Sequence, residues 1–519
     1  MNTKFKVQAA ALAVLSALSL LPGTAMAETV YKAKTDTGAD ILDFIENRRR
    51  ARLMNKLTEE QEELVRATEE MKQRLRRPVD ATKAVPTSFE GDELTYDQNT
   101  GEFTARGKVH IVQMDGHQFD AVDGLVTGNT LKQEIAVPGE AHMLQLTPGQ
   151  ARITLDGVNT FYRYGERTGT MELAKGKVDH QYVSGKKFEF YPDKIIIYEG
   201  TTTKCGAKKP DYHVSGDKIT IYPNDKMIVE NAKFWAKNTV LFTRKRYEQS
   251  MEPGAKNKDN FPSVGYSKGE GVWIAQNLRI PLVGGLYGRA HLYASSKHGM
   301  RSRGTLNYNW GKANFEVAYG FYKDGEDRWL KREPSFIYSY GGPVGFRSHL
   351  NYNLKGELGR WYKSSGNVRS MHRYYRAELS RDPITLGKNW WLGLNVGYSL
   401  TQETYDDSQN RGFDWSATTI KEFDDRWAVY GRYSYSNKNT KNSLFDYDLD
   451  DFSRKVDTGV SYRVDDKNRF LVGLRYDMDK HKLNEVDYYW FHDMHCSQLV
   501  LRYRGKSHNW SVTWDFLPW

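Results

Sequence analysis

The sequence contains few of the features that would assign it to the most common classes of exported or membrane protein. Its 519 residues include 2 cysteines and 15 prolines. Two cysteines exclude a disulfide-dense scaffold and a cysteine-rich zinc module, and leave room for one bridge. The mean hydropathy is −0.71, and only one segment, near the N-terminus, is apolar for long enough to suggest a membrane helix. These values exclude a helical membrane protein.

Aromatic residues and glycine are abundant instead. Aromatics make up 13% of the chain, with 33 tyrosines, and there are 44 glycines. A transmembrane β-barrel combines this composition with low hydropathy, because only alternate residues face lipid and aromatic girdles line both interfaces. The formal charge of +10 at pH 7 is a mild basic excess. It suits an anionic ligand or a membrane surface, and we expect no nucleic-acid partner for an exported chain.

The first 27 residues have the features of a secretory signal peptide. Lys4 and Lys6 give a positive start, residues 9–21 are apolar, and Ala25-Met26-Ala27 is a small-x-small cleavage site. The alternative, an N-terminal membrane anchor, would need a longer apolar core. The mature chain is therefore expected in an oxidising compartment, where Cys205 and Cys496 can pair.

Residues 28–87 are expected to be a helical and linker segment. Apolar residues recur at helical spacing over 39–77, and Leu57, Leu64 and Met71 are seven apart, before Pro78 ends the pattern. We expect one solvated helix or a short coiled coil that acts as a spacer. A role in docking a partner is the alternative.

In residues 88–235 apolar residues recur at every second position instead of at helical spacing. Turn signals such as Asp115-Gly116 and Asp156-Gly157 interrupt this pattern at short intervals. Many short strands at this spacing predict an antiparallel sandwich or β-jelly roll. The segments 91–96 and 103–109 are expected to pair as neighbouring strands.

Residues 236–519 predict a C-terminal antiparallel transmembrane β-barrel. Runs of about ten alternating residues recur, as in 346–354, 392–401 and 470–478. In the last run the pattern places Leu474 toward lipid and Leu471 toward the lumen. The length supports about 14–16 strands. A soluble sandwich would also alternate, but the recurring charged residues on the polar side and the aromatics at run ends favour a barrel.

The final strand has the pattern of an outer-membrane insertion signal, with apolar residues on one face and a terminal aromatic. Its residues are Trp510, Val512, Trp514, Phe516 and Trp519.

The order of these parts, with two cysteine segments, resembles a known family. Residues 202–205 end in Cys205 and are followed by Pro210-Asp211, and Cys496 leads the strand at 497–504. Over residues 88–519 the chain resembles the LptD (organic-solvent-tolerance, OstA) family of lipopolysaccharide-assembly proteins, as a short-barrel member. It departs from that family in having two cysteines where members often have four.

The resemblance implies an outer-membrane lipopolysaccharide translocon with its jelly roll in the periplasm. Lipopolysaccharide would pass from the jelly roll to the barrel and leave through a lateral seam, and a Cys205–Cys496 disulfide is implied. The implied partners are lipopolysaccharide, an LptA-like periplasmic jelly-roll bridge, the barrel-assembly machinery and an LptE-like plug lipoprotein.

Two sets of residues would contact the lipid. Candidates for lining an acyl-chain groove in the jelly roll are Val109, Ile111, Phe119, Ile135, Ile153, Leu155, Phe188, Phe190, Ile195, Ile197, Ile219 and Ile221. Basic candidates on the lumen side of the barrel strands are Arg289, Arg347, Arg432, Arg463, Arg475 and Arg502. For each residue the alternative is an ordinary core or a generic solvated lumen position.

We find no pattern for catalysis and expect no enzyme activity, cofactor or metal. Ser267 lies between glycines without the strand-to-helix context of a nucleophile. His492, Asp493 and His495 could bind a metal, but a polar turn explains them better. The alternative functions are an outer-membrane porin or diffusion channel and, less favoured, an outer-membrane lipid hydrolase.

Overall fold

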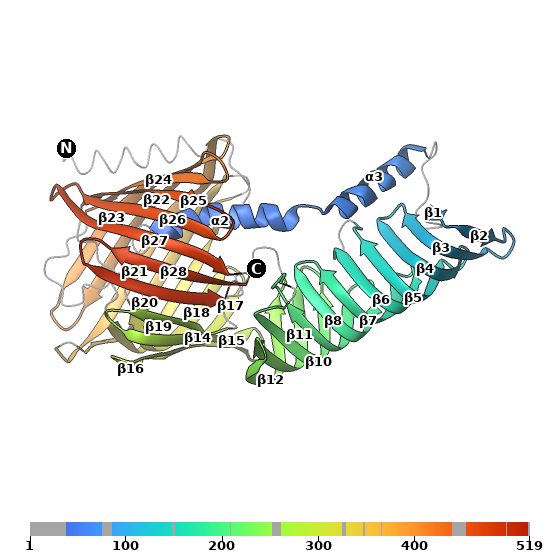
Figure 1. The fold of residues 1–519 in the computed structure, drawn as a ribbon. Coiled ribbons are helices and arrows are strands. Elements are labelled where there is room, and N and C mark those ends of the chain that lie inside the picture. Colours follow the sequence, from blue (N-terminus) through green and yellow to red (C-terminus); the bar gives the residue numbers. More distant parts are fainter. Residues whose placement is uncertain are drawn as a thin grey trace. The chain divides into compact units, whose positions relative to one another are not determined.

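The computed structural model describes residues 38–74, 86–147, 151–207, 209–251, 261–323, 329–345, 348–364, 366–437, 453–494 and 496–516. The chain forms two compact units. Among the described residues, one unit contains 38–51 together with 261–516, and the other contains 52–251. Nearly all regular structure in both units is antiparallel β (Figure 1). The signal-peptide prediction lies outside the described residues.

Two helices replace the single helix predicted over 39–77. They are α2 (Gly38–Asn55) and α3 (Glu59–Arg74). The break is a capping box: the Gln61 backbone N–H donates to Thr58 Oγ1 (3.3 Å), and the Thr58 N–H donates to Gln61 Oε1 (3.2 Å). Such a box starts a new helix because it satisfies donors that the first turn leaves open. Among the described residues, neither helix has the length and apolarity needed to cross a membrane.

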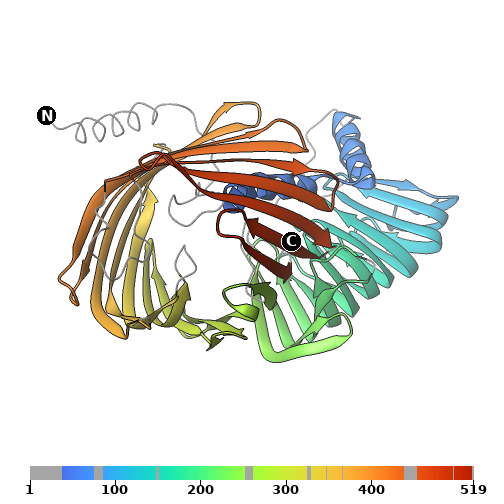
Figure 2. The ribbon, with the colours of Figure 1, turned by 60° about the vertical axis from the view of Figure 1, so that its left-hand side comes forward.

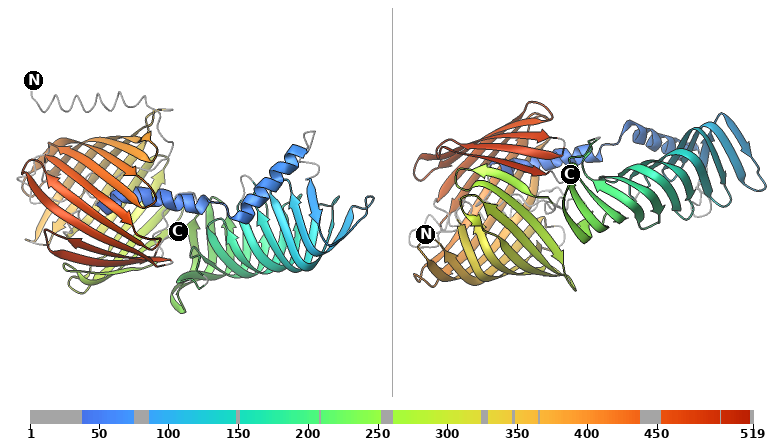
Figure 3. Two further views of the ribbon diagram at one scale, coloured as in Figure 1. Left: turned by 45° about the horizontal axis from the view of Figure 1, so that its top comes forward. Right: turned by 60° about the horizontal axis from the view of Figure 1, so that its bottom comes forward.

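The unit that contains residues 52–251 is built on one twelve-stranded sheet. Its strands are β1 (Thr87–Glu90), β2 (Glu93–Tyr96), β3 (Glu102–Gln113), β4 (His117–Asn129), β5 (Glu134–Gln145), β6 (Ile153–Arg163), β7 (Thr168–Val178), β8 (Gln181–Phe190), β9 (Ile195–Thr203), β10 (Tyr212–Tyr222), β11 (Lys226–Ala236) and β12 (Thr239–Ser250). From β3 onward each strand pairs with the next in sequence (Figure 3). β2 pairs with β3 as predicted. The order is a meander, and the described strands show no jelly-roll crossover.

The predicted boundary at residue 235 is too early. β12 pairs with β11 along its whole length and belongs to the sheet. Phe242 stacks on Phe234 with ring centroids 4.3 Å apart, and Tyr247 is buried against the same ring. The alternating charges of this edge strand resemble the polar side of a barrel strand, which explains the misassignment.

The sheet folds over on itself, so that one sheet forms two layers. The residue on β6 in register with Phe119 is Leu155, two strands away. Tyr162 lies seven positions further along β6, about 23 Å in a straight strand. The rings of Phe119 and Tyr162 are nevertheless 5.5 Å apart. The strand must therefore turn back, and its register shifts twice between Asp156 and Phe161.

A buried polar contact joins the two layers. Tyr162 Oη lies 3.1 Å from His117 Nε2, and His117 also contacts Gln145 and Asp115. Burial holds the pKa of Tyr162 above its ordinary value, so the hydroxyl keeps its proton. These groups are satisfied inside the fold, as buried polar groups must be.

The other unit is a closed antiparallel barrel of sixteen strands, with the two-residue strand β16 beside β15. The described strands are β13 (Ser263–Ser267), β14 (Gly271–Pro281), β15 (Leu286–Ser295), β16 (Gly299–Met300), β17 (Arg303–Trp310), β18 (Ala313–Lys323), β19 (Trp329–Pro343), β20 (Leu350–Lys363), β21 (Val368–Gly387), β22 (Trp390–Glu403), β23 (Gln409–Glu422), β24 (Trp427–Ser436), β25 (Arg454–Arg463), β26 (Asn468–Asp477), β27 (Lys482–Met494), β28 (Ser497–Arg504) and β29 (Asn509–Phe516). The barrel and the predicted strand number are confirmed.

The two faces of the barrel wall differ as the alternation predicts. Large apolar side chains are exposed on the outside of the wall, among them Trp310, Tyr319, Phe336, Tyr375, Tyr398, Phe470, Leu474, Tyr488 and Trp510. Leu474 is 39% exposed, whereas Leu471 is fully buried on the inner face. An exposed apolar surface that continues around a closed barrel is typical of contact with lipid.

We predict that Leu474→Arg destabilises the barrel in a bilayer. A charge on the lipid face costs about 2–4 kcal/mol near the midplane. Denaturant unfolding in lipid vesicles measures this loss. Leu474→Ala is the matched control, because it removes the same side chain without adding a charge. Equal losses for the two variants would contradict the assignment of this face to lipid.

Candidate transport site

The twelve predicted lining residues share the interior of the folded sheet. Each is exposed by 4% or less, and they lie on β3 to β10 from one end of the sheet toward the other. In the structure these buried side chains form a filled core. An acyl chain could enter only if the two layers separated, so a lipid-binding role for these residues stays a prediction.

A cavity of about 180 Å³ lies between the two layers. Ile153 and Ile195 line it together with Phe190, and Asp193 and Lys194 add charges. Its volume is below the roughly 300 Å³ at which small-molecule sites usually begin. Three of the predicted lining residues therefore border open space.

Helix α2 occupies the barrel lumen, where its first three turns pack against the inner wall (Figure 2). Ile41, Leu42, Phe44 and Ile45 are 1–5% exposed. They pack on inward-facing residues of β22 to β27, namely Trp391, Ile420, Ala428, Tyr430, Leu471, Tyr489 and Phe491. The prediction of a solvated spacer helix is wrong for α2, because its apolar stripe is buried inside the barrel.

A buried ion cluster fixes the helix in place. Glu46, which is 7% exposed, forms an ion pair with Arg463 and lies 3.7 Å from Arg469. Arg48 stacks over the Trp391 ring at 4.8 Å. Removing one member of such a cluster leaves an uncompensated buried charge, so the cluster holds α2 in one register.

The predicted lumen arginines all face inward where the structure describes them, but most are already paired. Arg463 pairs with Glu46, Arg475 with Asp457 at 3.2 Å, and Arg502 with Asp487 at 2.8 Å. Arg432 is buried and donates to Thr418 Oγ1. Arg347 lies outside the described residues.

The arginine on β15 has a different environment. Arg289 is exposed to the lumen, and its register partner on β14 is Arg279, also exposed. Both guanidinium groups lie over the Tyr287 ring, at 5.2 and 4.3 Å. These three side chains, here called the β14–β15 basic patch, present two cations to the lumen. Sequence reasoning missed Arg279 although it follows the same alternation.

The barrel closes through a short seam. β13 and β29 pair at four positions, from Val264↔Trp514 to Ser267↔Ser511, whereas β28 and β29 pair at eight. Fewer ladder hydrogen bonds make this pairing the easier one to open. The predicted insertion-signal residues from Trp510 to Phe516 lie on β29, with Trp510 exposed outward, and Trp519 lies outside the described residues.

Both cysteines are disulfide-bonded, and since the chain has two, the bond joins Cys205 to Cys496. This confirms the predicted pairing. The other polar candidates stay in ordinary local contacts: His492 Nδ1 lies 2.9 Å from Asn468 Oδ1, and Asp493 accepts from Gln498 Nε2. His495 lies outside the described residues, and Ser267 Oγ accepts the backbone N–H of Glu270 in a turn.

The structure also brings together charged groups that the sequence did not reveal. Glu60, Asp120 and His142 come from α3, β4 and β5 and place one ligand atom each within 4.8 Å of one another. Their wide separation in sequence gives no local motif.

Comparisons with known proteins give no family assignment. No protein-family model matches the sequence, and no significant match was found among curated proteins. Solved structures that match include a porin of Rh. blastica (9% identity, TM-score 0.29, covering 49% of this chain and 96% of that one). Others are the outer-membrane channel DcaP of Acinetobacter baumannii (11% identity, TM-score 0.30, 49% and 94%) and an anion-selective porin from Comamonas acidovorans (11%, 0.23, 69% and 89%).

We predict that Glu46→Ala releases α2 from the lumen wall. Two buried arginines would lose their carboxylate, and breaking a buried pair costs about 3–5 kcal/mol. Single-channel recordings in planar bilayers should show larger or more frequent conductance steps than the parent protein. Glu62→Ala, an exposed acid on α3, is the control and should leave conductance unchanged. Identical recordings for both variants would mean that α2 does not limit the pore.

A second prediction concerns the disulfide. Because it closes a very long loop, it removes roughly 5 kcal/mol of unfolded-chain freedom in the chain-entropy model. The oxidised protein should migrate faster than the reduced protein on denaturing gels, and Cys496→Ser and Cys205→Ser should abolish the shift equally. Alkylation of both thiols in the unreduced native protein would rule the bond out.

Proposed function

We propose that this chain is an outer-membrane transport protein that delivers an anionic amphiphile, lipopolysaccharide, to the membrane. The observation that carries the proposal is the combination of two parts in one chain: a folded sheet with a continuous apolar interior, and a barrel with a lipid-type outer face and a short seam. Such a pair suits a cargo with apolar chains and a charged head.

The folded sheet supports the part of the proposal that concerns the apolar chains of the cargo. Its interior runs through β3 to β10 without a break, and it borders a cavity between the layers. Its edge at β1 and β2 pairs, among the described strands, with β3 alone. An open edge accepts another strand, which fits an LptA-like periplasmic bridge.

The barrel supports the part of the proposal that concerns the charged head of the cargo. The longest stretch of sequence between consecutive barrel strands separates Ser436, the end of β24, from Arg454, the start of β25, and these two strand ends lie opposite the start of β13 and the end of β29. Outer-membrane barrels keep short turns in the periplasm, so we assign the end with β13 and β29 to that side. The β14–β15 basic patch lies toward this end, since Arg279 is two residues from the end of β14. Two exposed cations there suit phosphate groups.

The position of helix α2 in the lumen affects two expectations, the plug lipoprotein as a partner and the diffusion channel as the alternative function. An LptE-like plug would share the lumen with α2, so the proposal needs no separate plug. A diffusion channel would need an open path past the helix. That second candidate is favoured by the β14–β15 basic patch, whose exposed arginines would equally attract small anions.

The test of the proposal is photo-crosslinking in cells. A photoreactive amino acid at Ile111 or Phe190, inside the sheet, should capture lipopolysaccharide. The same group at Leu173, an apolar residue that is 69% exposed, is the control and should not. Adducts confined to protein would favour a filled structural core.

Depletion of the protein separates the two candidate functions. Lipopolysaccharide stranded in the periplasm supports assembly. Normal lipopolysaccharide export with loss of small-anion uptake, reduced further by Arg279→Ala and Arg289→Ala, supports a channel and would replace the proposal.

A further inference from the structure

A row of alternating acidic and basic side chains crosses the outer face of the folded sheet. Register pairs His110 with Asp120, Asp120 with His142, and His142 with Asp156, on β3 to β6. These residues alternate with the buried interior, so they lie on the opposite face of the sheet. Residues directly opposite on neighbouring strands are close enough to interact.

Helix α3 covers part of this outer face. Leu64 is 1% exposed and packs on Val112 and Leu144, the outward-facing neighbours of His110 and His142. The capping box at Thr58 fixes where α3 begins, and Glu60 precedes Leu64 by four residues on the same side of the helix. Cap and apolar contact together direct the Glu60 carboxylate toward the row.

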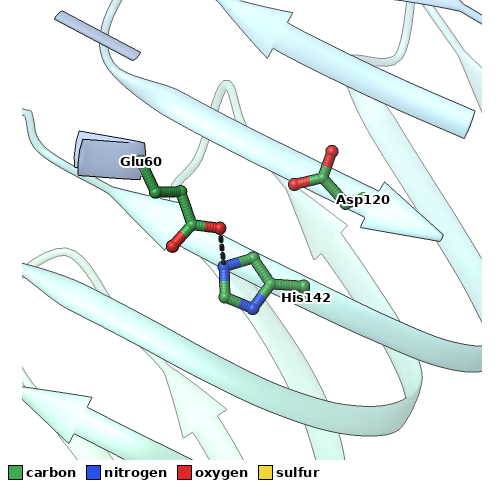
Figure 4. Close-up of side chains that lie close together, drawn as sticks. All are labelled: Glu60, Asp120 and His142. Carbon is green, nitrogen blue, oxygen red and sulfur yellow. Dashed lines mark ion pairs between the residues drawn. The ribbon is translucent and has the colours of Figure 1, made fainter. Parts of the chain in front are cut away.

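The hydrogen bonds of His142 determine which nitrogen faces the helix. Nδ1 lies 2.7 Å from Asp156 Oδ1, which assigns the ring proton to that side. Nε2 is shielded from solvent, lies 3.0 Å from Glu60 Oε1 and has no well-aligned hydrogen bond. Figure 4 shows the Glu60 carboxylate and the His142 ring approaching each other beside Asp120.

Three electron-pair donors therefore converge: one imidazole nitrogen and two carboxylates, all within 4.8 Å. Such a set repels itself unless a positive charge lies among its members. We propose that Glu60, Asp120 and His142 bind a divalent transition metal, Zn²⁺, with water as the fourth ligand. Imidazole with carboxylate oxygen is a donor set that zinc accepts.

The geometry needs only a small adjustment. Ligand atoms about 2.1 Å from a tetrahedral zinc lie about 3.4 Å from one another, so the three side chains must close by roughly an ångström. Glu60 is half-exposed and its side chain can make that movement.

The neighbouring groups already hold the ligands in place. Asp156 orients His142, the carboxylate–histidine arrangement typical of metal sites. Gln118 Nε2 donates to Asp120 Oδ2 at 2.7 Å, and His110 pairs with the other oxygen. A bound metal would tie α3 to β4 and β5, so the site would set how firmly this helix stays on the sheet.

The test is zinc titration of the full chain in detergent micelles, followed by calorimetry. We expect one saturable site, lost in His142→Ala and in Asp120→Asn. Asp156→Asn should keep the site but weaken it about 10–100-fold, as for other groups that orient a ligand. Hydrogen exchange of residues 59–74 should slow when zinc is added to the parent protein and not to His142→Ala.

His180→Ala, a histidine of the same unit outside the row, is the matched control and should bind zinc as the parent does. The proposal is overturned if the parent binds no zinc at one site, or if His142→Ala binds it equally well. Either result would leave the row as a ladder of contacts between histidine and carboxylate side chains without a metal. None of these readouts depends on transport, so failure here would leave the proposed function untouched.

Discussion

The pairing of each strand with the next strand in sequence is the constraint on which both units depend. With a side-chain period of two, a fixed register decides which residue of every pair faces inward. In the barrel it sends Leu471 to the lumen and Leu474 to the outside. In the sheet it lines up His110, Asp120, His142 and Asp156 on one face and the apolar core on the other. A slip of one residue would reverse both faces at once.

The same alternation made the barrel and the faces of its strands predictable from the sequence. It could not give the fold of the sheet, because a meander that doubles over and a two-sheet sandwich bury the same alternate residues. The deciding features are local bulges, such as the register shifts beside Val158, and no residue pattern marks them uniquely. The break between α2 and α3 was different, since Thr58-Glu59-Glu60-Gln61 is a capping-box sequence that could have predicted it.

The position of α2 shows where periodicity fails as a guide. An apolar stripe predicts that a helix packs on something, but the sequence does not say on what. Ile41, Leu42 and Phe44 find their partners on β22 to β27, hundreds of residues away. The inward side of the barrel wall was expected to be wet and polar. It contains Trp391, Leu471 and Phe491, and these apolar positions on the polar side of their strands were the available sign of a partner inside the lumen.

This position changes the expected cost of substitutions on the inner wall. For an empty, hydrated lumen, Leu471→Arg would be cheap compared with Leu474→Arg, since the charge would meet water. Leu471 is instead fully buried with Tyr430 and Tyr489 in the cluster that holds α2. An arginine there would have no carboxylate partner in that cluster and would have to displace the helix or be buried unpaired, which is costly in either case. Both faces of β26 are thus sensitive to charge, the outer one because of lipid and the inner one because of the helix.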